Sequence, residues 1–288
     1  MAESVTIQAH AKINLSLDIT GKRPDGYHTV EMVMQSIDIS DTLTVTKTDS
    51  GIELVCSDDD LPTDNRNLAY RAAELFFEKA EIDGGAIIKL KKRIPTAAGL
   101  GGGSADAAAV LTALNELYNL PFDDEDMDEL AITLGADVPF CLVGGTQLAE
   151  GIGSILSPLP TLTDCAFVIV KAGEKKSTGE MYDRFDSIPE IDIIRPRTQS
   201  LVDAICEGDK SEAGRHMYNV FNRLWEYENI RGIMTDCGAQ NVCVSGSGPS
   251  VFGFFTDLDD AHDAESKLKS VYDDVFFCEP LGCGLEID

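Results

Sequence analysis

Residues 94–115 place three adjacent glycines directly before an alanine-rich run, in the sequence IPTAAGLGGGSADAAAVLTALN. Glycine has no Cβ, so a glycine-rich loop can bend to positive φ and let a ligand approach its backbone N–H groups. A helix that begins immediately afterwards adds unpaired N–H groups and a partial positive charge. The segment therefore predicts a binding site for an anion such as a phosphate.

The run after the glycines predicts an amphipathic helix of about four turns, because apolar side chains recur there at helical spacing. Ser104 stands where the N-cap is expected. A flexible loop before an ordinary helix is the alternative. Two familiar phosphate motifs do not fit. A P-loop needs Lys-Ser or Lys-Thr after the glycines, whereas Ala105 follows Ser104. Ser104 also occupies the last glycine position of the dinucleotide-binding pattern.

The net charge restricts the partners of the protein. The 288 residues include 50 acidic and 23 basic side chains, which gives a formal net charge of −27. Such a chain would repel a nucleic acid or an anionic membrane surface, so we expect neither as a partner. A phosphorylated ligand would need a locally basic pocket, backbone donors or a metal counter-ion. The basic residues near the motifs, which are alternatively just solvated, are Lys12, Lys22, Arg23, Lys91, Lys92, Arg93, Lys171, Lys175 and Lys176.

The length predicts two domains, since a single core rarely grows beyond about 250–300 residues. Prolines and small polar residues over 153–164 place the boundary between domains 1–157 and 158–288. Alternation and apolar stripes predict the elements. The expected strands cover 4–19, 32–48, 51–57, 85–94, 161–173 and 274–282, with a strand–turn–strand unit over 241–257. The expected helices cover 67–80, 104–118, 123–135, 177–185, 196–208, 210–227 and 259–272.

The eight cysteines and four histidines show no metal-binding or disulfide pattern in the sequence. The cysteines lie in apolar contexts without a C-x-x-C pair, so we expect reduced and mostly buried thiols. The histidines His10, His216 and His262 lack metal-ligand spacing, and no Cys/His cluster is evident, so we expect no structural zinc site. The N-terminus lacks a basic start followed by an apolar block, which favours a cytoplasmic protein.

Several stretches together resemble the GHMP kinases, the family of galactose, homoserine, mevalonate and phosphomevalonate kinases. The stretch PTAAGLGGGSADAA resembles the family's phosphate-binding second motif, AKINLSLDI its first motif and SGSGPSVFG its third. GKRPDGYH and LGADVPF resemble members whose substrate carries a cytidine diphosphate. These landmarks run from residue 11 to residue 253 in the family's order.

The resemblance implies an α+β fold of two domains. It implies an N-terminal domain like the second domain of ribosomal protein S5, a ferredoxin-like C-terminal domain, and an active site in the cleft between them. It also implies ATP-dependent phosphorylation of the 2-hydroxyl of 4-(cytidine 5′-diphospho)-2-C-methyl-D-erythritol. The alternatives are another small-molecule kinase of the family and a non-catalytic ligand-binding paralogue. The protein could be a monomer or a homodimer.

The same resemblance implies which residues hold ATP. They are Pro95, Gly99, Leu100, Gly101, Gly102, Gly103 and Ser104 for the phosphates, and Asn67 near the adenine. The hydroxyl of Ser104 is also a candidate ligand of the Mg²⁺ that accompanies the nucleotide. A helix cap explains the same serine equally well.

An aspartate and a lysine are the candidate catalytic pair. Asp137 is bracketed by glycine and proline in an apolar stretch, and a buried carboxylate needs a cationic partner. Lys12 interrupts the apolar first strand and is the suggested partner; a solvent-facing position is its alternative. By resemblance, Asp137 would accept the hydroxyl proton while Lys12 orients the hydroxyl and stabilises negative charge. Whether Asp137 acts as a true base stays open.

Four further residues are implied to bind the substrate. Tyr27 and His28 would contact the cytosine, because an aromatic face and an imidazole can hold a planar base. Asn14 would lie near the acceptor hydroxyl, and Tyr182 would cover the other face of the cytosine. A structural role for the Tyr-His pair in a turn is the alternative.

Overall fold

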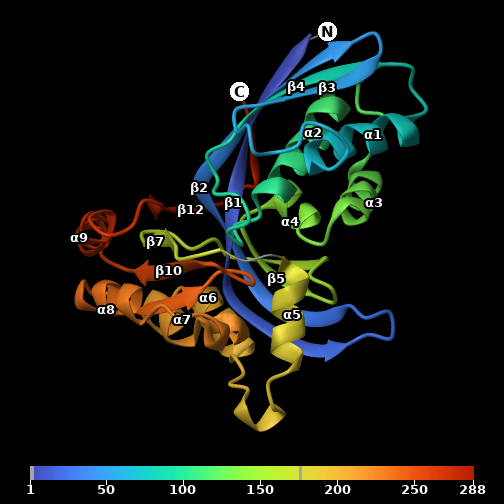
Figure 1. Ribbon diagram of the computed structural model, residues 1–288. Helices are drawn as coiled ribbons and strands as arrows, with labels where there is room; N and C mark the ends of the chain where they lie inside the picture. Colours follow the sequence, from blue (N-terminus) through green and yellow to red (C-terminus); the bar gives the residue numbers. More distant parts are fainter. Residues whose placement is uncertain (1–2, 175–176) are drawn as a thin grey trace.

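The computed structural model describes residues 3–174 and 177–288, which form two β-sheets and the helices that cover them (Figure 1). The first sheet has nine strands, and its central order is β13-β1-β2-β4-β3. Its strands are β1 (Ser4–Lys22), β2 (His28–Thr48), β3 (Gly51–Cys56), β4 (Gly85–Lys91), β5 (Thr146–Glu150), β6 (Ile155–Leu159), β8 (Tyr218–Asn219), β12 (Pro280–Leu281) and β13 (Leu285–Ile287).

Four helices cover one face of this sheet: α1 (Leu68–Ala80), α2 (Gly102–Leu117), α3 (Asp124–Leu134) and α4 (Val138–Val143). The alanine-rich helix α2 is buried along most of its length, and α1 packs against it. Its small side chains let it lie close to β1 and β2, so the start of α2 reaches the middle of the long β1 strand.

Two irregularities in the pairing of β1 with β2 decide which way the side chains of β1 point. The register shifts between His10 and Ala11 and again between Asn14 and Ser16. Outside these shifts, odd-numbered residues such as Ile7 and Leu17 join the core under the helices. Between them, Ala11, Ile13 and Leu15 pack instead against the second sheet. Bulges re-aim side chains in this way, and here they turn Lys12 and Asn14 toward the helix side.

The second sheet has the ferredoxin-like order that the family resemblance implies. Its strands β7 (Ala166–Lys171), β9 (Asn241–Val244), β10 (Ser250–Phe255) and β11 (Val275–Cys278) lie in the order β11-β7-β10-β9, all antiparallel. When these four strands are numbered in chain order, their order across the sheet is 4-1-3-2. The helices of this half are α5 (Thr178–Asp186), α6 (Thr198–Glu207), α7 (Lys210–His216), α8 (Glu228–Asp236) and α9 (Leu258–Lys269), with short 3-10 turns η1 (Glu190–Asp192) and η2 (Val220–Leu224).

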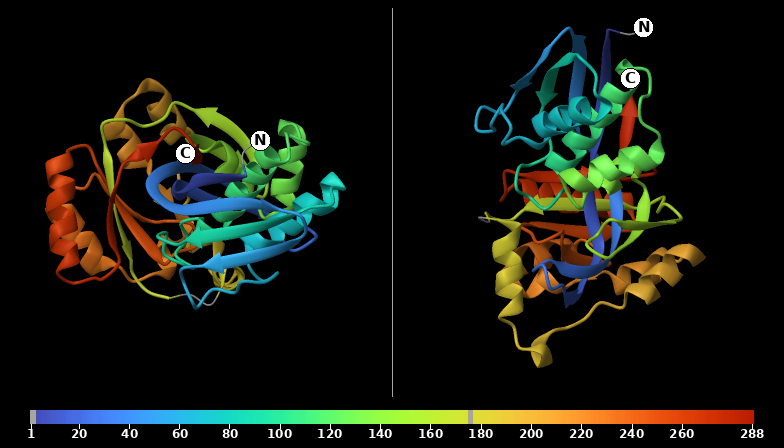
Figure 2. Two further views of the ribbon diagram at one scale, coloured as in Figure 1. Left: turned by 90° about the horizontal axis from the view of Figure 1, so that it is seen from above. Right: turned by 90° about the vertical axis from the view of Figure 1, so that its right-hand side faces the viewer.

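The layers are joined through β1 and β2, which run along both halves of the molecule (Figure 1). Seen from above, α8 and α9 lie on the opposite side of the molecule from α1, α2 and α3, with the sheets between them (Figure 2). One core lies under α1–α4, a second between the two sheets, and a third under α8 and α9. In the described part of the chain, none of the helices combines the length and apolar character required to cross a membrane.

The predicted helix over 210–227 is wrong beyond its first two turns, because α7 ends at His216. Two asparagine side chains bind the neighbouring strand instead. Asn219 Nδ2 donates to the carbonyls of Val244 and Gly246 at 2.7 and 2.8 Å, and Asn222 Oδ1 accepts from the N–H of Val244 at 2.9 Å. These tertiary bonds hold the chain in a short strand and a 3-10 turn, so they override the apolar periodicity.

The sequence also leaves several elements unpredicted. These are α4, α8, β5, β6 and β13, whereas β12 lies within the strand expected over 274–282. The strand β6 lies inside the stretch 153–164 that suggested a linker, and the last two strands return to the first sheet by pairing with β2 and β1. The division at residue 157 stays a prediction.

Candidate active site

All the residues predicted for ATP and substrate line one cavity of about 1020 Å³. That volume is at the upper end of what single small ligands occupy, so it suits two ligands side by side. The lining residues that were predicted are Lys12, Asn14, Asn67, Tyr27, His28, Pro95, Gly99, Leu100, Gly101, Gly102, Gly103, Ser104, Asp137 and Tyr182. The structure thus brings together residues from β1, the β1–β2 turn, the glycine loop, the start of α4 and α5.

The glycine loop leads directly into α2, but the predicted cap is wrong. The N-cap is Gly101, with φ of 75° in the left-handed region, and the described residues provide it with no side-chain cap. Ser104 lies inside the first turn. A Cβ on Gly101 would meet Lys12 Cγ at 2.9 Å, so the close approach of Lys12 requires glycine here. The first N–H groups of α2 are therefore left for an anion.

The glycine-rich stretch 245–253 makes hydrogen bonds to the glycine loop. The Ser245 hydroxyl donates to the Gly99 carbonyl at 3.1 Å, and the N–H of Ser250 donates to the Ala98 carbonyl at 3.1 Å. A Cβ on Gly99, whose φ is 81°, would meet the Ser245 carbonyl oxygen at 2.5 Å. The N–H of Lys12 also donates to the Leu100 carbonyl at 2.9 Å. These contacts fix the loop to both sheets.

Lys12 and Asp137 form the ion pair that the sequence suggested. Lys12 Nζ lies 3.3 Å from Asp137 Oδ2 and donates to Asn14 Oδ1 at 2.8 Å. The burial is the reverse of the expectation, since the Lys12 side chain is 5% exposed and the Asp137 side chain 34%. Asp137 is the N-cap residue of α4, which places its carboxylate at the cavity surface. The buried member is the lysine, and the carboxylate can reach a ligand.

A second lysine under the loop has a different environment, which the sequence did not reveal. Lys92 Nζ contacts Asp41 Oδ2 and lies 2.8 Å from Asp106 Oδ2. All three side chains are at most 8% exposed. Burial raises the pKa of Asp106, and Asp41 adds to the rise while Lys92 opposes it. In the sequence, Asp106 is a single charge within an alanine-rich run. That isolated charge is the signal that could have indicated a buried ion pair.

One wall of the cavity joins the β1–β2 turn to α5. Asp186 Oδ1 lies 2.7 Å from His28 Nε2, and Asp186 also pairs with Lys22. The hydrogen bond from Lys22, more than that from His28, holds the pKa of Asp186 below its usual value. The rings of His28 and Tyr182 are 4.9 Å apart at 34°. Tyr27 is 67% exposed, so its ring can contact a ligand.

Asn67, which was predicted to lie near the adenine, also has a structural role. Its Oδ1 accepts from the Ala69 N–H at 3.0 Å and so caps α1, and its Nδ2 donates to the Pro62 carbonyl at 2.9 Å. It lines the cavity beside Pro62 and Pro95. The cap fixes this edge of the cavity.

The basic residues near the motifs do not give the cavity a net positive charge in the part of the chain that the structure describes. The basic lining residues Lys12, Lys22, Arg66 and Lys92 are matched by the acidic ones Asp25, Asp106, Asp137 and Asp183. Of the other proposed basic residues, Lys175 and Lys176 lie outside the described residues. Basic and acidic side chains around the cavity are therefore equal in number, although the protein as a whole is strongly acidic. Backbone N–H groups should contribute more to anion binding here than side-chain charge does.

Comparison with known proteins shows the family to which the chain belongs. The family model of the "GHMP kinases N terminal domain" matches residues 67–145, and that of the "GHMP kinases C terminal" matches residues 201–274. The solved structure of a homoserine kinase from Cytophaga hutchinsonii shares the fold, with a TM-score of 0.79 at 21% identity over 100% of this chain and 98% of that one. The chain belongs to the GHMP kinase family.

Relatives within that family narrow the assignment. A 4-diphosphocytidyl-2-C-methyl-D-erythritol kinase of Clostridium botulinum (strain Eklund 17B / Type B) is 44% identical over 96% of this chain and 100% of its own length. One of Clostridium beijerinckii is 42% identical over 96% and 99%. A crystal structure of 4-(cytidine 5′-diphospho)-2C-methyl-D-erythritol kinase has a TM-score of 0.80 and 35% identity over 97% and 100%. Within the GHMP kinases, the protein groups with these enzymes.

Proposed function

We propose that the protein transfers the γ-phosphoryl group of ATP to the 2-hydroxyl of 4-(cytidine 5′-diphospho)-2-C-methyl-D-erythritol, giving the 2-phosphate and ADP in the non-mevalonate route to isoprenoids. The relatives that share over 40% of its residues along nearly the whole chain carry this activity in their names. The observation that carries the proposal is a single cavity lined by a glycine loop, an open carboxylate and the exposed ring of Tyr27.

The glycine loop is proposed to hold the phosphates of ATP. The N–H groups of Gly102, Gly103 and Ser104 are the first of α2, and an anion there is favoured by the unpaired donors and the helix dipole. A Cβ on Gly103 would have nothing within 4 Å, so this side of the loop is open. The fixed loop would hold the triphosphate without moving, and positioning is most of what a kinase must supply.

Lys12 and Asp137 are proposed to act on the acceptor hydroxyl. Asp137 would accept its proton as the oxygen attacks the γ-phosphorus, and Lys12 would keep the carboxylate oriented and stabilise the developing negative charge. The 3.3 Å ion pair and the exposed carboxylate support this division of roles. Asn14, which accepts from Lys12 Nζ, would keep that lysine in place.

The residues around the loop fit a hard divalent cation such as Mg²⁺. Hydroxyl and carboxylate oxygens are the ligands that Mg²⁺ takes, usually together with phosphate oxygens. Ser104, Asp106 and Asp137 offer such oxygens at the cavity, and the buried Asp106 Oδ1 makes no hydrogen bond to any described residue. When bound with ATP, the ion would neutralise part of the phosphate charge. The cavity side chains alone do not, because their positive and negative charges are equal in number.

The other end of the cavity is proposed to bind the cytidine. Tyr27 presents an exposed ring, and His28 and Tyr182 present rings that pack on each other. Burial, with a smaller contribution from the charge of Asp137, raises the pKa of Tyr182, so this ring lies near the catalytic carboxylate and stays neutral. A base stacked here would place its diphosphate-linked alcohol toward Asp137.

We also propose that the enzyme works in the cytoplasm. Each of the eight cysteines is free, and five of them are buried, which suits a reducing compartment.

A kinase assay with purified protein tests the proposal. ADP release is measured with ATP and Mg²⁺ in the presence of 4-(cytidine 5′-diphospho)-2-C-methyl-D-erythritol, homoserine, mevalonate or no acceptor. We expect ADP release only with the cytidine substrate. Turnover with homoserine or mevalonate instead would assign another activity of the family, and nucleotide binding without turnover on any acceptor would indicate a non-catalytic paralogue.

A further inference from the structure

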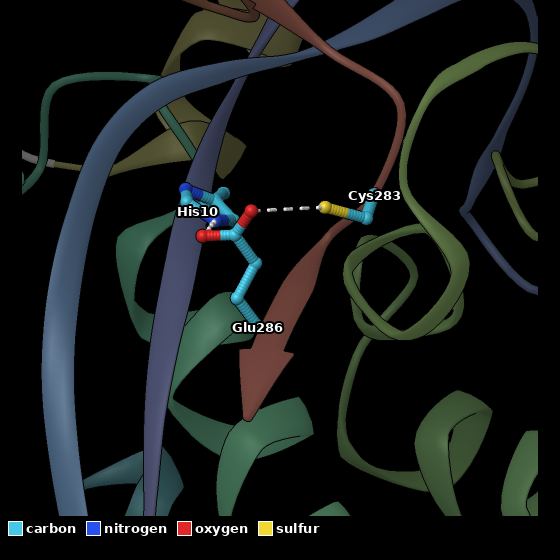
Figure 3. Close-up of side chains that lie close together, drawn as sticks. All are labelled: His10, Cys283 and Glu286. Carbon is cyan, nitrogen blue, oxygen red and sulfur yellow. Dashed lines mark hydrogen bonds and ion pairs between the residues drawn. The ribbon is translucent and has the colours of Figure 1, made fainter. Parts of the chain in front are cut away.

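His10, Cys283 and Glu286 come together on the far side of β1 from the active site, where the C-terminal strand returns to the first sheet. His10 and Glu286 lie on the paired strands β1 and β13, and Cys283 lies just before β13. Figure 3 shows the three side chains directed toward a common point. His10 Nε2 lies 3.4 Å from Glu286 Oε2, and Cys283 Sγ lies 3.9 Å from Glu286 Oε1.

The burial of His10 requires an explanation. The residue is 6% exposed, and neither ring nitrogen makes a hydrogen bond to any described residue. Nε2 is paired with the Glu286 carboxylate at 3.4 Å, whereas Nδ1 has no such partner among the described residues. A buried polar group without a partner costs about 1–3 kcal/mol.

The three ligand atoms match the needs of a borderline divalent cation. All lie within 4.8 Å of one another. Around tetrahedral Zn²⁺, the bond lengths imply about 3.4 Å between nitrogen and oxygen ligands and about 3.6 Å to a sulfur ligand. The His10–Glu286 distance already meets the first value, whereas the half-buried Cys283 thiol, 3.9 Å from the other carboxylate oxygen of Glu286, would have to move closer to meet the second. A mixture of imidazole, thiolate and carboxylate favours zinc-like ions over Mg²⁺.

We propose that His10, Cys283 and Glu286 bind a zinc-type divalent transition-metal ion, with the fourth position open to solvent. Glu286 is 56% exposed, so the ion can enter from the surface. The strand β13 pairs with β1 over only three residues, Leu285–Ile287. A metal that bridges His10 to Cys283 and Glu286 would fix this short strand in place, and the site would stabilise the fold rather than take part in phosphoryl transfer.

The sequence could not reveal this site, since His10 and Cys283 lie at opposite ends of the chain. The expectation that no Cys/His cluster exists is therefore wrong for the folded protein. Only the return of β13 to the first strand brings the ligands together.

Metal titration of the full chain tests the proposal. Protein freed of metal with a chelator is titrated with Zn²⁺ by calorimetry, and with Co²⁺ while the thiolate-to-cobalt charge-transfer absorption is followed. The wild type should bind one ion per chain with that absorption, and Zn²⁺ should raise its midpoint of thermal unfolding. Cys283→Ser should lose the absorption and bind Zn²⁺ roughly 10-fold or more weakly.

Cys206→Ser is the matched control, because Cys206 is an exposed cysteine on α6, which lies elsewhere in the fold. It should behave like the wild type in all three measurements. His10→Gln should weaken Zn²⁺ binding as Cys283→Ser does. Absence of the charge-transfer band in the wild type, or equal Zn²⁺ affinity in Cys283→Ser and Cys206→Ser, would overturn the proposal.

Discussion

Two lysines support the glycine loop, and their aspartate partners differ in one respect. Lys12 is buried and pairs with Asp137, whose side chain is 34% exposed at the cavity. Lys92 is buried and pairs with Asp41 and Asp106, which are 0% and 4% exposed. The same kind of ion pair therefore serves two purposes. A carboxylate that a ligand can reach can take part in chemistry directly, whereas the buried carboxylates beside Lys92 hold the loop and could act on a ligand only through a bound cation.

The largest effect should come from removing the open carboxylate. Asp137→Asn keeps the shape of the side chain but cannot accept a proton, so we expect kcat to fall by about 10²–10⁴-fold. The free energy of unfolding in urea should also fall, because the buried Lys12 ammonium loses its counter-charge and keeps only the amide oxygen of Asn14 as a partner. Steady-state kinetics and urea titration measure the two effects. Asp128→Asn, which removes a charge from the exposed side of α3, is the control. Unchanged kcat in Asp137→Asn would remove the aspartate from the mechanism.

The sealed cluster should show its effect in stability. Lys92→Met leaves two buried carboxylates without a cation, and removing one partner of a buried ion pair costs about 3–5 kcal/mol. Lys12→Met should cost less, since Asp137 can be solvated. The free energy of unfolding in urea distinguishes the two variants. Equal losses would show that the exposure of the aspartates does not separate the clusters.

Two glycines of the loop should differ in the same way, one affecting stability and the other affecting ATP binding. Gly101→Ala places a Cβ 2.9 Å from Lys12 Cγ at φ of 75°, so we expect a loss of about 1–3 kcal/mol. Gly103→Ala meets nothing within 4 Å. That variant should keep its stability while its KM for ATP rises, because the new methyl group enters the phosphate site. The reverse pattern in urea unfolding and kinetics would contradict the role of the loop.

The aromatic end of the cavity should affect binding only. Tyr27 is 67% exposed, so Tyr27→Ala should leave the unfolding free energy within about 0.5 kcal/mol of the wild type. The loss of base stacking, worth about 1–3 kcal/mol, should raise the KM for the cytidine substrate. Tyr27→Phe keeps the ring and serves as the control. A KM that is unchanged in Tyr27→Ala would place the cytosine elsewhere.

The smallest effect concerns the ion pair that joins the β1–β2 turn to α5. The pKa of Asp186 is held low, first by Lys22, so the carboxylate stabilises the fold above its ordinary pKa of about 3.9. That stabilisation is lost as the pH falls through the lowered pKa. Asp186→Asn should lose about 0.2–1 kcal/mol at neutral pH, and its difference from the wild type should shrink in acid. Urea unfolding across pH measures this, and a difference that grows in acid would contradict the assignment.

Local patterns explain what the sequence could predict. The alternation of β1 and the apolar stripe of α2 arise from neighbouring residues, and both elements are present. The cap at Ser104 failed because Gly101 is the N-cap, where the left-handed φ and the close approach of Lys12, a residue distant in the chain, require glycine. The helix expected over 210–227 failed because Asn219 and Asn222 bind β9.

Tertiary contacts explain what the sequence could not predict. Motifs identified the residues of the cavity, but not that Asp137 would be the open partner and Lys12 the buried one. The Lys92 cluster joins residues from β2, α2 and the segment after β4, so no spacing along the chain indicates it. The balance of charge around the cavity likewise depends on which side chains turn inward.

The most direct test of the difference between the two lysine clusters is a crystal structure with a non-hydrolysable ATP analogue and the cytidine substrate. We expect the γ-phosphate at the N–H groups of Gly102–Ser104 and the acceptor hydroxyl within about 2.6–3.2 Å of an Asp137 oxygen, with Asp106 in direct contact with neither ligand. A triphosphate bound away from the loop, or an acceptor hydroxyl that faces Asp106 instead of Asp137, would contradict the account.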